Sequence, residues 1–459
     1  MLNKISPLLI KIVFLISSLT AINFVYAEEK KAISLSQVTK DVSYLASDKL
    51  KGRSNYSPEI RIAADYIANR FKESGLTAAN SISNTGFFQK YQIIKTTPNI
   101  LHITINGQSI VTENSTMAGT MTHFSWQKSN EIKNTDFTIH SIGKNEDMRA
   151  IIKQLNNEGG KHLVLLSPSH KALFQRYQQY FQQGTTRLAK ENINNAEENM
   201  LVIALSSITA NKVTNLTVTG KSALSENELL NVVAVIPGKT KPEEVVLYSA
   251  HYDHLGIETG EGDIIYNGAD DDASGTTAII NLAQYFANRG NNARTLMFAA
   301  FSAEEIGGFG SHYFSKQLDP ETITAMINIE MIGKPSKFGA GTLWMTGMER
   351  SDLGKQLNKT LVKLNQEIYE DPYPEQNLFY RSDNATLARL GVPAHSFSST
   401  QLDKDEHYHQ ASDDLSSLNL NSLHQVIKTL ATATQPLVDG SITPSRIDKD
   451  LIKSKGLIF

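Results

Sequence analysis

The sequence contains no cysteine among its 459 residues. This absence excludes disulfide frameworks, zinc sites built from thiolates, cysteine-ligated iron–sulfur clusters and cysteine nucleophiles. Any metal site must therefore be built from His, Asp and Glu. Glycine and proline are also sparse, at 28 and 13 residues, which excludes a collagen-like or largely disordered chain.

A strong excess of charge of either sign is lacking as well. Lys and Arg number 44 against 47 Asp and Glu, for a net charge of −3. This balance argues against a nucleic-acid partner held by bulk positive charge. Outside the N-terminus, no apolar stretch approaches the length of a membrane-spanning helix. The length and 40% hydrophobic content suit two or three globular domains.

The N-terminus has the pattern of a secretory signal peptide. Lys4 precedes a nearly uninterrupted apolar run at residues 12–25, and the tripeptide VYA at 25–27 is followed by charged residues. The run is short for a bilayer span, and the small-residue site predicts cleavage after Ala27. We expect residues 1–27 to be removed, with a retained anchor as the alternative. The mature chain would be exported to the periplasm or beyond, without stable membrane association.

From residue 226 onward, buried strand patterns alternate with helical patterns. Strands are expected at 245–250, 295–301, 324–331, 342–346 and 393–397, and helices at 273–287, 310–317, 351–365, 385–390 and 415–438. A further helix is expected at 60–76, in the entry segment that precedes residue 98. This alternation predicts an α/β fold with a mostly parallel central sheet flanked by helices. Short alternating runs within 98–225 predict an inserted smaller domain, β-rich or α+β. The main domain would then combine 28–97 with 226–459.

Polar clusters follow the predicted strands, at the edge where such sheets bind ligands. They are His251-Tyr252-Asp253-His254, the triplet Asp270-Asp271-Asp272, Glu304-Glu305, Glu330, and His407-Tyr408-His409 with Asp413. Each cluster alone has an ordinary interpretation as a helix cap, a solvated turn, or a histidine whose hydrogen bonds are made within the fold. Together, so many carboxylates at one edge would repel one another unless divalent cations were bound. Imidazole and carboxylate ligands suit zinc, with manganese or cobalt as alternatives.

The motifs HYDHLG, NGADDDASG, SAEEIGGFGS, NIEMIG and HYHQASDD occur in this order. The set resembles the two-zinc exopeptidases typified by bacterial secreted leucyl aminopeptidases. Glutamate carboxypeptidase II, the transferrin receptor and the glutaminyl cyclases share their phosphorylase/hydrolase-like fold. The resemblance covers about 226–436, and the entry segment around Gly52-Arg53 looks similar too. It implies a metallo-aminopeptidase acting on peptides with a free N-terminus, and by position the insert 98–225 would be a protease-associated domain.

The resemblance also implies a role for each residue of the clusters. His251 and Glu330 would hold one zinc ion and Glu305 and His409 a second, with Asp271 bridging the two.

The remaining implied roles concern the reaction. Glu304 would be the general base that takes a proton from the attacking water and then protonates the leaving amine. Asp253 would orient His251 through its other ring nitrogen. The peptide bond between Asp271 and Asp272 would be cis.

The chain departs from the family pattern at two positions. Glu330 stands where the family often has Asp, and a longer carboxylate can still bind metal. Asn384 replaces the histidine of the usual Ser-Asp-His, a change expected to affect the pocket. His407 competes with His409 as a ligand, and His409 is preferred because its spacing to Asp413 is that of the family.

Three further residues have expected places near the site. His254 and His395 are expected to be structural or to line the pocket, and Tyr380 is a candidate donor on the oxyanion side.

Other activities of the same fold stay open. A carboxypeptidase or dipeptidase would need a basic group for the substrate carboxylate, and only Arg381 is offered near the site. A glutaminyl cyclase, which keeps one zinc, is a second alternative. A catalytically inactive binding module is a third, although Glu304 and all five ligand positions carry competent residues.

Overall fold

The computed structural model describes residues 32–80, 82–83, 85–132, 135–189 and 198–453. The predicted signal peptide lies outside them. The described chain divides into two compact units, one within 1–89 and 230–450, the other within 90–229 and 451–459. The boundaries expected after residues 97 and 225 fall inside two long strands, β2 (Phe88–Ile105) and β10 (Leu216–Ile236). Because each strand is continuous there, no loop marks those positions in the structure.

The first unit is built on a sheet with the strand order β17–β16–β18–β15–β11–β14–β10. The strands besides β10 are β11 (Lys241–His251), β14 (Arg294–Phe301), β15 (Ile323–Ile329), β16 (Leu343–Met345), β17 (Ile368–Glu370) and β18 (Ala394–Ser398). Strand β11 is parallel to β14 and β15, and β15 to β18. Only β10 and β16 run antiparallel to their neighbours β14 and β18. The predicted mostly parallel sheet is confirmed.

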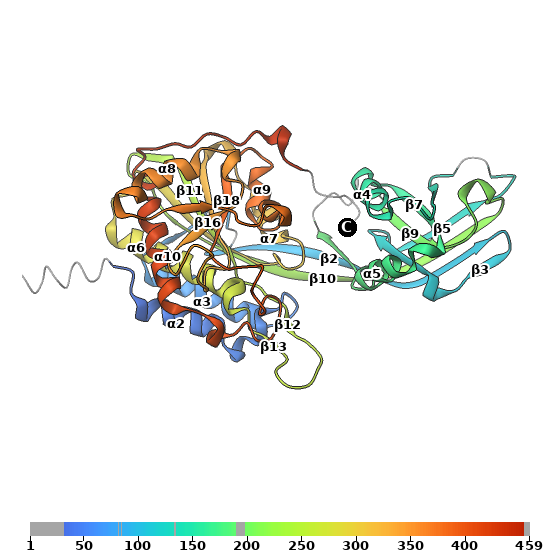
Figure 1. The fold of residues 1–459 in the computed structure, drawn as a ribbon, viewed down its shortest axis with the longest axis horizontal. Helices are drawn as coiled ribbons and strands as arrows, with labels where there is room; N and C mark the ends of the chain where they lie inside the picture. Colours follow the sequence, from blue (N-terminus) through green and yellow to red (C-terminus); the bar gives the residue numbers. More distant parts are fainter. Residues whose placement is uncertain (1–31, 81, 84, 133–134, 190–197, 454–459) are drawn as a thin grey trace, which may run out of the picture. The chain divides into compact units, whose positions relative to one another are not determined.

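Helices cover this sheet (Figure 1). They are α2 (Leu35–Leu45), α3 (Glu59–Glu73), α6 (Gly275–Arg289), α7 (Phe309–Ser315), α8 (Leu353–Leu361), α9 (Asn384–Ala388), α10 (Leu420–Ala433) and α11 (Gln435–Val438). Helix α6 packs on β11 and contacts α2, α3 and α10, while α9 packs on β15 and β18 and contacts α7. Residues 245–251 of β11 are all buried, which is consistent with the mainly apolar, non-alternating sequence of this strand.

Local sequence explains the first helices. Ser34 caps α2 by accepting a hydrogen bond from the backbone N–H of Gln37. Along α3, apolar side chains at helical spacing are buried, including Ile60, Ile67 and Phe71, as the periodicity predicts. Gly75 has φ +82 just after the helix, the left-handed conformation that glycine favours at helix ends.

The single helix expected over 415–438 is wrong. A short 3-10 turn at Leu415–Ser417 precedes α10, and α11 is a separate helix after Thr434. Pro436 sits in the first turn of α11, where its missing N–H costs nothing. Inside a continuous helix the same proline would have removed a backbone hydrogen bond.

The second unit has its own sheet, in the order β4–β9–β7–β6. Its elements are β4 (Ser115–Gly119), β6 (Thr138–Ile142), α4 (Met148–Glu158), β7 (Lys161–Leu166), α5 (Lys171–Gln182) and β9 (Met200–Leu205). Strand β5 (His123–Lys128) pairs with β10, and β3 (Gln108–Ile110) and β8 (Thr185–Leu188) pair with β2. The protease-associated fold of this region stays a prediction. Across the described residues, no helix combines the length and apolarity that a membrane span requires.

Candidate metal centre

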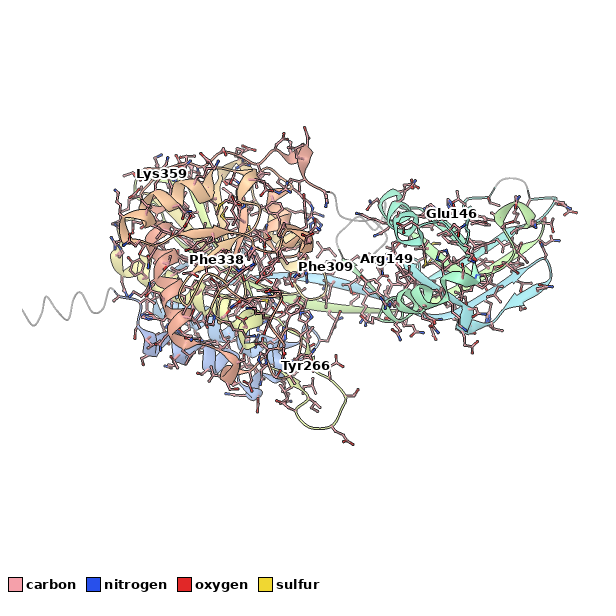
Figure 2. The ribbon with its side chains drawn as sticks, in the orientation of Figure 1. Glu146, Arg149, Tyr266, Phe309, Phe338 and Lys359 are labelled. Carbon is pink, nitrogen blue, oxygen red and sulfur yellow. The ribbon has the colours of Figure 1, made fainter. Side chains whose placement is uncertain are left out.

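Three parallel strands deliver side chains to one edge of the sheet. His251 is the last residue of β11, and Glu330 directly follows β15. Glu304 and Glu305 lie in the turn between β14 and α7, whose first residue, Phe309, is marked in Figure 2. Asp271 lies in the irregular turn Ala269–Ser274 that leads into α6. The carboxyl ends of parallel strands share an edge, so these groups converge as the sequence predicts.

The two oxygens of Asp271 face two separate groups. His251 Nε2 lies 3.1 Å from Asp271 Oδ1 and 3.6 Å from Glu330 Oε1. His409 Nε2 lies 3.2 Å from both Asp271 Oδ2 and Glu305 Oε2. One buried carboxylate is therefore shared between two sets, each of one imidazole and one further carboxylate. The structure thus brings together all five residues proposed as metal ligands.

The chemistry of these donors fits a divalent metal. His251 Nε2 is buried and, among the described residues, makes no aligned hydrogen bond despite its closeness to Asp271. Burial opposes the charged forms, yet the facing carboxylates hold the pKa of His251 well above its usual value. In Asp271, burial is likewise outweighed by His251 and His409, which hold its pKa well below the usual range. The site is therefore arranged to hold positive charge among carboxylates.

Glu304 differs from its neighbour Glu305. The residue is half-buried, and the partial burial of its carboxyl group raises its pKa well above the ordinary value, with His251 opposing and Glu330 adding to the shift. Glu304 lines the same cavity as Asp271, Glu305 and Glu330. A carboxyl group with a raised pKa beside a metal site can accept a proton and return it.

Asp253 acts on two partners. The Nδ1 of His251 lies 3.1 Å from the main-chain oxygen of Asp253 and 3.7 Å from its carboxylate. That carboxylate accepts the backbone N–H groups of Glu304 and Glu305, at 3.1 and 3.2 Å. Asp253 therefore anchors the turn that carries both glutamates as well as lying beside His251.

Asn55 completes this anchor and was missed by the sequence analysis. Its Nδ2 donates to Asp253 Oδ2 at 2.6 Å, and its Oδ1 accepts the N–H of Ala303 at 2.9 Å. The only sequence signal was its position two residues after Arg53, in the entry segment of the family resemblance.

Residues 401–414 bring His409 to the site. The carboxylate of Asp413 accepts the backbone N–H groups of Asp270 and Asp271 at 3.1–3.2 Å, which fixes this segment beside the acidic turn. His407 instead bonds Ser412 through its Nδ1 at 3.0 Å. The structure therefore places His409, rather than His407, against Asp271.

A cavity adjoins the carboxylates. Its lining includes Met331, Trp344, Thr346, Leu378, Arg381, Ser382, Ser396, Ser398, Leu402 and Tyr408. Tyr408, which precedes His409 in the chain, is one of these lining residues. The role of Tyr380 as a donor on the oxyanion side stays a prediction.

Other expected features lie beside the cavity. The peptide bond Asp271–Asp272 is cis. Asn384 is buried and donates to the main-chain oxygens of Phe379 and Ala394, so it supports the cavity from behind instead of lining it. His395 is buried in β18 and is structural.

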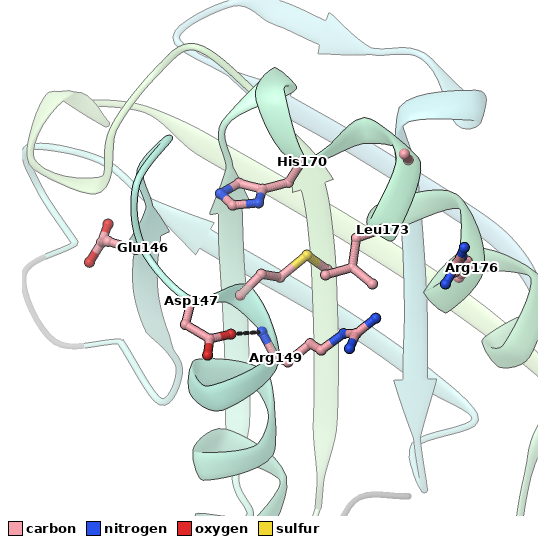
Figure 3. Close-up of a pocket in the computed structure, with 8 residues that line it drawn as sticks. Glu146, Asp147, Arg149, His170, Leu173 and Arg176 are labelled. Atoms are coloured by element: carbon pink, nitrogen blue, oxygen red, sulfur yellow. Dashed lines mark hydrogen bonds between the residues drawn. The ribbon is translucent and has the colours of Figure 1, made fainter.

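A second cavity lies in the other unit, between α4 and α5 (Figure 3). Its labelled side chains mix acidic and basic groups, and Asp147 is already used to cap α4 through the backbone N–H of Arg149. Glu146, Arg149 and Arg176 are exposed. This cavity has no cluster of buried ligand-type side chains, so the site of the first unit is the candidate for chemistry.

Comparison with known proteins agrees with this geometry. The family model described as peptidase family M28 matches residues 231–434. Leucine aminopeptidase 1 of Ajellomyces dermatitidis is 28% identical over 208 residues, covering 43% of this chain and 53% of the relative. A probable zinc metalloprotease of Pyrenophora teres f. teres is 34% identical over 116 residues, or 25% and 24% of the two chains. The match to this chain thus covers about half of the first relative's length and about a quarter of the second's.

Solved structures share the fold. The aminopeptidase from Aneurinibacillus sp. strain AM-1 has a TM-score of 0.53 at 17% identity, covering 93% of this chain and 97% of that one. The zinc aminopeptidase from Bacillus subtilis has a TM-score of 0.52 at 16% identity, covering 92% and 99%. The sheet, the convergent donor set and the family match agree on the same part of the chain, residues 231–434, which is similar to peptidase family M28.

Proposed function

We propose that the chain is a zinc-dependent aminopeptidase that removes N-terminal residues from peptides. The observation that carries the proposal is that the two oxygens of Asp271 face two different histidines. Oδ1 faces His251, which also contacts Glu330, and Oδ2 faces His409, which also contacts Glu305. Such a shared carboxylate suits two zinc ions. The relatives named leucine aminopeptidase and zinc metalloprotease support both the reaction and the metal.

Two bound zinc ions would polarise the scissile carbonyl and lower the pKa of the attacking water. The chain's own residues supply the proton transfers. Glu304 takes the proton from the attacking water and delivers it to the nitrogen of the leaving amine. The hydroxyl of Tyr408, which lines the cavity, is placed to donate to the carbonyl oxygen as negative charge develops there.

The cavity suits the free end of a peptide. Trp344, Leu378 and Leu402 provide apolar walls for the first side chain. The carboxylate of Glu330, which also lines the cavity, provides negative charge toward a protonated α-amino group. An N-acetylated peptide lacks that positive charge and should be refused.

We also infer that the protein is exported to the periplasm or beyond. The support is the apolar run at residues 12–25 followed by a small-residue cleavage site. Peptides are then the partners, and nucleic acid is not, since the net charge of the chain is −3.

Replacement of Glu304 by Gln tests the reaction. The amide keeps the size of the side chain but cannot accept the proton, so kcat should fall by about 10²- to 10⁴-fold. Zinc content should be unchanged, because Glu304 holds no ligand position. Turnover of leucine p-nitroanilide and zinc analysis measure the two effects. Glu321→Gln, at an exposed glutamate paired with Arg446, is the matched control, and a Glu304 variant with wild-type kcat would remove Glu304 as the base.

Product masses separate the aminopeptidase from its sister activities. Free and N-acetylated peptides are incubated with the zinc-loaded protein, with and without a chelator. Stepwise loss of N-terminal residues from free peptides alone supports the proposal. A carboxypeptidase is the second candidate, because Arg381 lines the cavity and could bind a C-terminal carboxylate. Loss of C-terminal residues would favour it, loss of ammonia from N-terminal Gln would indicate a cyclase, and no product would favour a binding module.

A further inference from the structure

His254 is a buried imidazole beside the candidate metal centre that the reaction above does not use. It lies three residues after His251 and just beyond the end of β11. Its Nδ1 lies 2.6 Å from Glu305 Oε1, and the side chain is fully buried. His254, Asp271 and Glu305 each offer a ligand atom within 4.8 Å of the others. The ring is therefore part of the centre, not a distant structural histidine.

The two oxygens of Glu305 are divided between two imidazoles. Oε1 meets His254, whereas Oε2 lies 3.2 Å from His409 Nε2. A carboxylate has no proton to give, so the proton of the short contact belongs to His254 Nδ1. This contact occupies Oε1, while Oε2 faces His409.

The ring of His254 is itself held in place. Its backbone N–H donates to the main-chain oxygen of Arg53 at 3.3 Å. A Cβ at Gly268 would stand 2.5 Å from Cγ of the ring and 2.2 Å from the main-chain oxygen of Asp271. Only glycine therefore leaves room for the imidazole, and the ring has little freedom to turn away from Glu305.

We propose that His254 is a positioning residue that donates its Nδ1–H to Glu305 Oε1 and so presents Oε2 to the metal shared with His409. The proposal rests on the proposed function, because it assigns a zinc ion to the Glu305 and His409 side of the centre. Partners of this kind fix the orientation of a ligand, and their removal weakens metal binding without abolishing it.

Zinc affinity tests the proposal without reference to turnover. Zinc is titrated into the metal-free full-length protein against a chromophoric chelator, so that the two ions are resolved by affinity. His254→Phe should weaken one ion by about 10- to 100-fold and leave the other unchanged. His254→Gln keeps a side-chain N–H donor and should recover most of the loss. His409→Ala identifies which ion belongs to the Glu305 side.

His407→Phe is the matched control, since it removes a nearby imidazole that bonds Ser412 and not Glu305. Unchanged zinc affinity in His254→Phe would overturn the inference. Loss as complete as in His409→Ala, with no recovery in the Gln variant, would make His254 a direct ligand and also overturn it. If the Phe variant fails to fold, a wild-type affinity in His254→Asn and His254→Ala would have the same force. A wild-type protein that binds no zinc would overturn the proposed function itself.

Discussion

His395 shows how the burial of one imidazole makes the stability of this protein depend on pH. Its ring is fully buried in β18. The Nδ1–H donates to the main-chain oxygen of Thr346 at 2.8 Å, and Nε2 accepts from the hydroxyl of Ser351 at 2.7 Å. Both partners suit the neutral ring. Burial therefore lowers the pKa of His395 from 6.5 to about 4.

The pH dependence of stability follows from this shift. The unfolded chain binds a proton at His395 below about pH 6.5, whereas the folded chain does so only near pH 4. The free energy of unfolding should therefore fall as the pH drops through this window, by about 2 kcal/mol between pH 7 and 5. Urea unfolding of wild type and His395→Asn at both pH values measures it. The Asn variant should lose about 2 kcal/mol less, and equal losses would contradict the prediction.

Single residues also show where sequence analysis stops. The residue types at positions 251, 271, 305, 330 and 409 could be predicted, because imidazole and carboxylate at strand ends are visible in the sequence. The groups that hydrogen-bond to these residues and to their neighbours could not be predicted. Asp253 was expected beside His251, yet its carboxylate also holds the backbone of Glu304 and Glu305. A backbone N–H has no sequence signature, so such a partner appears only in the folded chain.

At the scale of elements, Lys334 joins two segments of the site. Its Nζ lies 2.8 Å from Asp405, 3.5 Å from Asp413 and 3.6 Å from Asp270. Burial raises the pKa of Asp270 to about 7, with Lys334 opposing the shift and Asp413 adding to it. The ammonium therefore ties residues 401–414, which carry His409, to the acidic turn before α6.

Lys334→Met should weaken the attachment of residues 401–414 to the acidic turn before α6. Three buried carboxylates would lose their common cation, which costs about 3–5 kcal/mol of stability. The affinity for the zinc ion shared with His409 should fall, because the segment carrying His409 loses its anchor. Lys334→Arg should restore part of both. Urea unfolding and zinc titration measure the effects, and a Met variant with wild-type values in both would show that Lys334 carries no such tie.

Elements were predicted best where patterns are local. The buried strands over 245–250, 295–301 and 324–331 correspond to β11, β14 and β15, because apolar runs report burial on both faces. The prediction of one helix over 415–438 is wrong because the apolar periodicity continues through Pro436, whereas the backbone forms two separate helices, α10 and α11. Periodicity describes which side chains are buried, and it does not detect a missing N–H.

At the scale of the whole molecule, the two units have separate cores. The first is centred on β11, β14, β15 and α6, and the second on two clusters around β7 and β9. All candidate ligands of the metal centre lie in the first unit. A ligand that binds only the folded form of one unit stabilises that unit.

Zinc should therefore shift one thermal transition and not the other. At free zinc about 1,000 times the dissociation constant, the first unit should gain about 4 kcal/mol. Calorimetry with zinc and with a chelator should show one transition moving and one fixed. In His409→Ala the movement should shrink, because one ligand set is incomplete. Equal movement of two transitions, or of none, would contradict the prediction.

The residue types of the metal centre and the sheet edge at which they meet can be predicted from the sequence. The lack of cysteine left imidazole and carboxylate as ligands, and strand ends in a parallel sheet place such groups together. Tertiary structure decided which atoms meet. Asn55 contacts Asp253 across 198 positions, Tyr408 lines the cavity, and His254 contacts one oxygen of Glu305. These contacts depend on loop paths and packing between distant segments, which local periodicity does not encode.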